Sequence, residues 1–206
     1  MAASVLRARQ TGCSLPRHTA RLRRPPTAYS SRAADGDDSP SPCRSSPRLV
    51  YDRSVRLYLA GPLFSEAERA WLDALAGRLR ADGFDCFVPH EQFEEMTTLT
   101  TDEVYRTDAE GLRGSNVLVA WLDGAAVDDG TACEIGMFAQ LVAGGDPRYV
   151  GIVGIATDLR LERRRGVVAG DGLNLFLGGA VSASGRLCWS VDEAIETLAS
   201  WRTSGR

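Results

Sequence analysis

The stretch that decides the fold is NVLVAWLDGAAVDDGTACEIGMFAQLVA, residues 116–143. Its first seven residues are almost continuously apolar, which is typical of a strand buried on both faces of a sheet. An Asp- and Gly-rich loop follows at 123–130, and an apolar helix is expected at 131–143, closed by Gly144 and Gly145. A buried strand that leads through a short loop into a helix is the repeating unit of an α/β protein.

The same alternation extends in both directions from this stretch. Further strands are expected at 55–60, 84–88, 149–155 and near 187–189, and further helices at 65–82, 102–113 and 190–202. Ser65 and Glu68 have the spacing of a capping box, and Gly83 is placed to end that helix. Residues 157–172 are expected to form a long loop, followed by a short element at 173–177.

This order of elements predicts an open, mainly parallel sheet with helices on both faces. Such a sheet binds ligands at the carboxyl ends of its strands. Polar side chains directly after strands are therefore the first candidates for a site.

Composition and charge exclude several classes of protein. Hydrophobic residues make up 44% of the chain and no apolar run approaches the length that spans a bilayer, so a membrane protein is not expected. Residues 51–206 carry 15 Arg and 24 acidic residues, which argues against nucleic acid as a partner. The five Cys show no metal-binding spacing and there are only two His, so neither a metal site nor a disulfide framework is expected.

The first fifty residues differ from the rest. They carry nine Arg against three Asp, and they are rich in Ala, Ser and Pro. This composition predicts a disordered tail, with an organellar transit peptide as one interpretation, ahead of a single domain at 51–206. The expected location is cytoplasmic, with a plastid or mitochondrion as the alternative if the tail is a transit peptide.

Four polar residues have a functional and a structural interpretation from the sequence alone. Glu134 is expected in the first turn of its helix, where the macrodipole would keep it ionised as a nucleophile toward a sugar carbon, or where it only satisfies the helix end. Asp108 is either a reactive acid or part of a solvated helix face. Tyr58 is either a core side chain or a partner of a carboxylate. Asn174 is either a ligand or a helix cap.

Taken together, the segments around these residues resemble the nucleoside 2-deoxyribosyltransferase family. The matching pieces, in chain order, are Tyr58-Leu59-Ala60-Gly61-Pro62-Leu63-Phe64, Asp108, Ser115-Asn116-Val117-Leu118-Val119-Ala120, Asp128-Asp129-Gly130-Thr131, Glu134-Ile135-Gly136 and Asn174-Leu175. The resemblance implies a flavodoxin-like fold and no cofactor. Asn116 departs from the family pattern, in which an Asp is common at this position.

The resemblance also implies roles for individual residues. Glu134 matches the nucleophile that attacks C1′ of deoxyribose, Asp108 the acid that shuttles a proton to and from the base, and Tyr58 the side chain that orients the nucleophile. This division of work agrees with the two-carboxylate chemistry of retaining glycosidases.

Four further residues match substrate-binding positions of the family. Asp128 and Asn174 match residues that hold the sugar 5′-hydroxyl, the Asn reaching in from a neighbouring subunit, and Gly61 and Gly130 belong to the same set. The implied partners are small-molecule nucleosides and nucleobases, and the implied active form is a homo-oligomer with shared active sites.

Three alternatives remain open at this stage. An N-glycoside hydrolase on the same scaffold would use water in the second step and act on nucleosides or on deoxynucleoside 5′-monophosphates. Asp128 favours a free 5′-hydroxyl over a phosphate, since a dianion is unfavourable beside a carboxylate. The phosphoribohydrolases that activate cytokinins share Gly-Thr-x-x-Glu but carry a Pro-Gly-Gly run before it. A non-catalytic nucleoside-binding domain would not need both Asp108 and Glu134.

Overall fold

The computed structural model describes residues 55–93, 98–164 and 172–205, with the side chains of 162–164 left out. The expectations for residues 1–50 fall outside this range and stay predictions. Among the helices that the structure describes, none is long and apolar enough to cross a membrane.

The core of the domain is a five-stranded sheet in which every neighbouring pair is parallel. Its strands are β1 (Arg56–Ala60), β2 (Asp85–Phe87), β3 (Val117–Trp121), β4 (Gly151–Ile155) and β5 (Gly185–Cys188). Their spatial order is β2-β1-β3-β4-β5. This is the flavodoxin-like order, so the expected fold class is confirmed, with a sheet that is entirely parallel.

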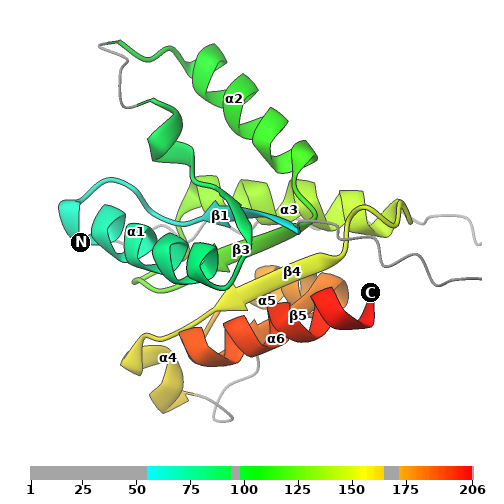
Figure 1. Cartoon of the computed structure of the whole chain (residues 1–206). Coiled ribbons are helices and arrows are strands. Elements are labelled where there is room, and N and C mark those ends of the chain that lie inside the picture. The colour runs from blue at the N-terminus through cyan, green and yellow to red at the C-terminus, as the bar shows by residue number, and fades with distance from the viewer. Residues whose placement is uncertain (1–54, 94–97, 165–171, 206) are drawn as a thin grey trace, which may run out of the picture. The chain divides into compact units, whose positions relative to one another are not determined.

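Helices cover both faces of the sheet (Figure 1). One buried cluster packs α1 (Glu66–Ala81) and α6 (Val191–Ser204) on one face, and a second packs α2 (Thr101–Gly114), α3 (Asp129–Ala143) and α5 (Leu175–Ser184) on the other. Strand residues alternate between the two clusters: Leu57 and Leu59 face the first, and Tyr58 and Ala60 the second. The period-2 geometry of a strand therefore turns Tyr58 toward α2 and α3.

Local sequence signals set the helix ends. Ser65 and Glu68 form the expected capping box of α1, and Gly83 follows that helix with φ +82°. Thr100 and Glu103 make a second capping box at the start of α2. Asp128 caps α3, which therefore begins at Asp129, two residues earlier than expected.

Two expectations for the second half of the chain were wrong. The expected loop at 157–172 contains a short helix, α4 (Leu159–Arg164), as well as a segment outside the described residues. The short element expected at 173–177 overlaps the start of a ten-residue helix, α5, which begins at Leu175 directly after its cap Asn174. Leu177 and Val181 of α5 are buried one turn apart, and such a pair on one face stabilises a helix that a short apolar run does not reveal.

Candidate active site

A cavity of about 130 Å³ opens at the carboxyl edge of the sheet, where β1, β2 and β3 end. Three of its lining residues are carboxylates: Asp108 from α2, Asp128 from the end of the β3–α3 loop, and Glu134 from α3. The remaining lining residues are Gly61, Leu63, Phe64, Pro89, Gly130 and Thr131. The structure therefore brings together five of the seven residues that the sequence singled out, and Tyr58 joins them through Glu134.

Tyr58 orients the carboxylate of Glu134. Its hydroxyl donates a hydrogen bond of 2.5 Å to Oε1 of Glu134. The ring is fully buried in β1 and stacks on Phe87 with 5.2 Å between ring centroids. Burial, followed by the charges of Glu134 and Asp108, raises the pKa of Tyr58, so the phenol stays protonated and remains a donor. Both interpretations of Tyr58 hold, because it is a core side chain and also the partner of a carboxylate.

Glu134 differs from its expected setting in one respect. It is the sixth residue of α3, in the second turn, whereas the first turn was expected. The effect of the macrodipole falls off within one turn, so it does not keep this carboxylate ionised. Burial raises the pKa of Glu134 to about 7, opposed by the Tyr58 hydrogen bond and reinforced by the charges of Asp108 and Asp128.

Asp108 faces the same cavity from α2. Burial raises its pKa to about 6. Its Oδ1 is buried and has no hydrogen-bond partner among the residues described. An unsatisfied carboxylate oxygen is costly, and it is the kind of exception that a ligand or a proton explains. The interpretation of Asp108 as part of a solvated helix face is therefore wrong.

Asp128 is both a helix cap and a cavity residue. Its Oδ2 accepts hydrogen bonds from the backbone N–H of Thr131 (2.9 Å) and from the Thr131 hydroxyl (3.1 Å). These bonds occupy one carboxylate oxygen and fix the orientation of the group at the cavity.

Both glycines of the predicted set stand where space is short. A Cβ on Gly130 would lie 3.2 Å from Oδ2 of Asp128, and one on Gly61 would lie 3.2 Å from a methyl carbon of Leu72. Side chains at these positions would crowd the cap and the cavity wall.

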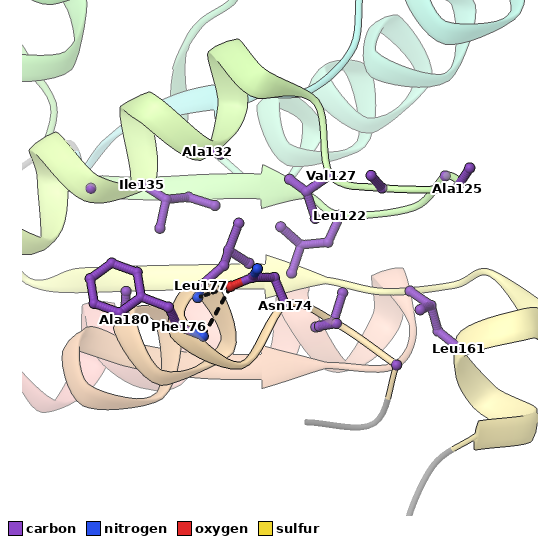
Figure 2. Close-up of a pocket in the computed structure, with 15 residues that line it drawn as sticks. Leu122, Ala125, Val127, Ala132, Ile135, Leu161, Asn174, Phe176, Leu177 and Ala180 are labelled. Carbon is purple, nitrogen blue, oxygen red and sulfur yellow. Dashed lines mark hydrogen bonds between the residues drawn. The ribbon is translucent and has the colours of Figure 1, made fainter. Parts of the chain in front are cut away.

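Asn174 lies apart from this cavity within the chain. Its Oδ1 accepts the backbone N–H groups of Phe176 and Leu177 at 3.0 and 3.2 Å and so caps α5. It lines a second cavity of about 440 Å³ between α3 and α5, whose other walls include Val127, Ile135 and Leu177 (Figure 2). The structure confirms the cap and does not bring Asn174 to the Glu134 of its own chain.

Four wall residues of the Glu134 cavity were not predicted as site residues: Leu63, Phe64, Pro89 and Thr131. A signal was present for Phe64, because it is a large apolar residue two positions after Pro62, in the short loop that follows a strand end. Its side chain is 81% exposed. In the part of the chain that the structure describes, no group of three or more His, Cys, Asp or Glu side chains could hold a metal ion.

This arrangement suits displacement at a sugar carbon. One carboxylate is partly buried and oriented by a tyrosine, and a second lines the same cavity and has a buried oxygen without a hydrogen-bond partner among the described residues. Their raised pKa values allow a proton to move on and off near neutral pH. Two carboxyl groups with separate roles are what cleavage of a glycosidic bond requires.

A protein-family model matches the part of the chain that lines this cavity. Residues 57–145 match the family model described as nucleoside 2-deoxyribosyltransferase, which confirms the resemblance seen in the sequence. The matched range contains Tyr58, Asp108, Asp128 and Glu134. Among curated proteins, no sequence matches the chain.

Solved structures share the fold. A conserved protein from Enterococcus faecalis V583 is 26% identical, with a TM-score of 0.57 over 71% of this chain and 98% of that one. The 2-deoxyribosyltransferase of Bacillus psychrosaccharolyticus is 20% identical, with a TM-score of 0.51, and the match covers 68% of this chain and 90% of that one. The 2-deoxyribosyltransferase of Leishmania mexicana is 18% identical, with a TM-score of 0.50, and the match covers 72% of this chain and 97% of that one.

Proposed function

We propose that this protein transfers 2-deoxyribose between nucleobases through a covalent glycosyl intermediate on Glu134. The observation that carries the proposal is the pairing of the Tyr58-bound Glu134 carboxylate with Asp108 in one cavity. The buried Asp108 Oδ1 has no hydrogen-bond partner among the described residues, so a proton on this carboxyl group is not already engaged by the protein. A binding domain would gain nothing from two partly buried acids, whose desolvation costs free energy in the folded state.

The reaction takes two displacements. In the first, an oxygen of ionised Glu134 bonds to C1′, the C1′–N bond breaks, and protonated Asp108 gives its proton to the departing base. In the second, a nitrogen of the incoming base bonds to C1′, the bond to Glu134 breaks, and Asp108 takes a proton back. Two inversions give net retention.

The proton of the carboxylate pair is decisive for the rate. Burial raises the pKa of Asp108 to about 6 and that of Glu134 to about 7, so the pair holds one proton between them in this pH range. In the reactive arrangement that proton is on Asp108 and Glu134 is ionised. Tyr58 favours the reactive arrangement because it donates to the ionised form of Glu134. The activity is therefore expected to peak where the pair holds one proton, between about pH 6 and 7.

Asp128 favours a nucleoside over a nucleotide as substrate. One of its oxygens is engaged by Thr131, and the other is available to accept the sugar 5′-hydroxyl. A 5′-phosphate would bring a second anion beside it, and like charges about 4 Å apart repel by roughly 4 kcal/mol at an effective dielectric constant near 20.

The alternative of a hydrolase acting on 5′-monophosphates makes the opposite kinetic prediction. Deoxynucleosides should exceed their monophosphates in kcat/KM by at least about tenfold, even if only part of this repulsion is felt. Asp128→Ser should narrow the gap, because serine keeps the helix cap and removes the charge. Equal use of the monophosphates would favour the hydrolase.

We also propose that the active form is a homo-oligomer in which Asn174 completes the site of a neighbouring subunit. In support, Asn174 is exposed and lines a different cavity from Glu134 of its own chain. The exposed Leu175 and Phe176 beside it, 62% and 88% accessible, offer apolar area for contact with that neighbour.

One incubation tests the central proposal. The protein is mixed with a deoxynucleoside, with and without a second base, and the products are separated. A new deoxynucleoside that forms only with the second base supports transfer, whereas free deoxyribose in both samples identifies a hydrolase. Glu134→Ala should lower turnover by about 10³-fold or more while the melting temperature is maintained. Turnover within tenfold of the wild type would exclude Glu134 as the nucleophile.

A further inference from the structure

The loop between β1 and α1 forms the wall of the Glu134 cavity that carries no charge. It contributes Gly61, Leu63 and Phe64, whereas the three carboxylates come from α2, α3 and the β3–α3 loop. A nucleoside bound by those carboxylates would therefore be bounded on this side by apolar side chains.

Arg69 ties this loop to α1. Its Nη1 donates a hydrogen bond of 2.7 Å to the carbonyl oxygen of Leu63 and one of 3.1 Å to that of Phe64. The neighbouring residue, Glu68, holds the N–H of the Phe64–Ser65 peptide, since its carboxylate accepts the backbone N–H of Ser65 at 2.7 Å. Two consecutive helix residues thus fix the backbone that carries Leu63 and Phe64.

The side chain of Phe64 has no comparable support. It lines the cavity but is 81% exposed, so little packing determines where the ring stands. Its position therefore depends on the backbone at Leu63 and Phe64, whose carbonyl groups Arg69 binds. A charged donor is stronger than a neutral one in this role.

We propose that Arg69 is a positioning residue, which acts through the backbone of Leu63 and Phe64 to hold the Phe64 ring against the planar base of the substrate. The inference rests on the proposed function, because it takes the occupant of the cavity to be a nucleoside. It assigns a binding role to a residue that neither touches the cavity nor carries any reacting atom.

A double-mutant cycle tests this inference. Arg69→Leu, Phe64→Ala and the combined variant are compared by steady-state kinetics with a deoxynucleoside donor and a second base. Arg69→Leu should lower kcat/KM by about tenfold, mainly through KM, because the wall binds the base in the ground state and the transition state alike. The combined variant should be no worse than Phe64→Ala, because both changes remove the same contact. Arg69→Lys, which keeps one donor, should recover part of the loss.

Arg78 provides the matched control. It lies on the same helix, and its guanidinium bonds to Asp192 at 2.6 Å, on an element that contributes nothing to the cavity. Arg78→Leu should leave both kinetic constants within about twofold, since a surface ion pair is worth little. If Arg69→Leu behaves like Arg78→Leu, or if its loss adds fully to that of Phe64→Ala, the positioning role is wrong. A wild-type protein that neither transfers nor hydrolyses any deoxynucleoside overturns the proposed function instead, and this inference with it.

Discussion

At the residue scale, the cavity is unusual in exposing one carboxylate pair whose pKa values are both raised. Burial moves Asp108 to about 6 and Glu134 to about 7. Titratable groups shifted toward neutral pH and facing one cavity are typical of acid–base sites. The hydrogen bond from Tyr58 lowers the pKa of Glu134, whereas burial and the charges of Asp108 and Asp128 raise it, so Tyr58 is the residue through which the pair can be perturbed selectively.

Tyr58→Phe should therefore change the pH profile in a defined way. The ring and its stacking on Phe87 are retained, and only the hydrogen bond to Glu134 is lost. The pKa of Glu134 should rise, which moves the alkaline limb of kcat/KM upward by about one unit and lowers the maximum by about tenfold. The loss in kcat/KM relative to the wild type should shrink above about pH 8, where the pKa of Asp108 alone sets the fraction of the enzyme in the reactive protonation state. An unmoved alkaline limb would show that Tyr58 only packs.

The raised pKa of Glu134 also makes the stability of the fold depend on pH. The folded-state pKa of Glu134, about 7, lies above its ordinary value of 4.5, so the folded protein binds more protons between these values than the unfolded chain. Stability from this group is present below about pH 4.5 and is lost as the pH rises through 7.

Glu134→Gln should remove this loss. At pH 8 the variant should exceed the wild type in free energy of unfolding by about 1–3 kcal/mol, and at pH 4 the two should agree. Urea unfolding at both pH values measures the difference. A variant that is less stable at pH 8 would contradict the raised pKa.

At the element scale, the position of Asp108 depends on how closely α2 approaches the sheet. Gly111, one turn after Asp108, lies against Phe87 of β2, and a Cβ there would come within 2.4–2.6 Å of the ring. The N-terminal end of α2 projects away from the sheet (Figure 1), so the C-terminal half, with buried Ala109, Gly111 and Leu112, anchors the helix.

Gly111→Ala should therefore displace α2 and its acid together. The expected effect is a loss of about 1–3 kcal/mol in the free energy of unfolding, typical of overpacking, and a fall in kcat. Gly77→Ala on α1 is the matched control, because a Cβ there meets nothing within 4 Å. That change should be neutral or stabilise by up to about 1 kcal/mol through helix propensity. Equal melting temperatures for the two variants would show that α2 tolerates the displacement.

At the scale of the whole molecule, five of the seven predicted residues line the Glu134 cavity of one chain, and Tyr58 is hydrogen-bonded to one of them. Asn174 is the exception, because it lines a different cavity. The proposed oligomer accounts for this separation, since a symmetric assembly can place one surface of each subunit against the site of the next.

Mixing two inactive variants tests that account. Glu134→Ala and Asn174→Ala subunits, dissociated and reassociated in equal amounts, should regain about a quarter of wild-type activity, because a site needs an intact Glu134 from one subunit and an intact Asn174 from its neighbour. Loss of the α5 cap in Asn174→Ala costs about 1 kcal/mol, so both proteins are checked by their melting temperatures. No recovery after verified exchange would place Asn174 outside the site.

The sequence by itself determined the alternation of strands and helices, and from it the parallel sheet. Continuous apolar runs such as residues 117–122, capping pairs such as Ser65 and Glu68, and glycines at helix ends are local signals that act within a few residues. They also indicated Glu134, Asp108, Tyr58 and Asp128, because polar side chains at strand ends and a family pattern are visible along the chain. They did not show α4 or the length of α5, where the apolar pattern is short.

Only the tertiary structure decided the chemistry of those residues. The hydrogen bond between Tyr58 and Glu134 joins positions 76 residues apart, and the pKa of Glu134 rises through burial by elements far away in the sequence. The helix macrodipole, which the sequence suggested, acts over one turn and is outweighed by this desolvation. Leu63 and Phe64 form a wall of the site only because the fold brings their loop beside Asp108 of α2 and Glu134 of α3. Charge and solvation at a site depend on what surrounds it in space, and a linear pattern does not contain that information.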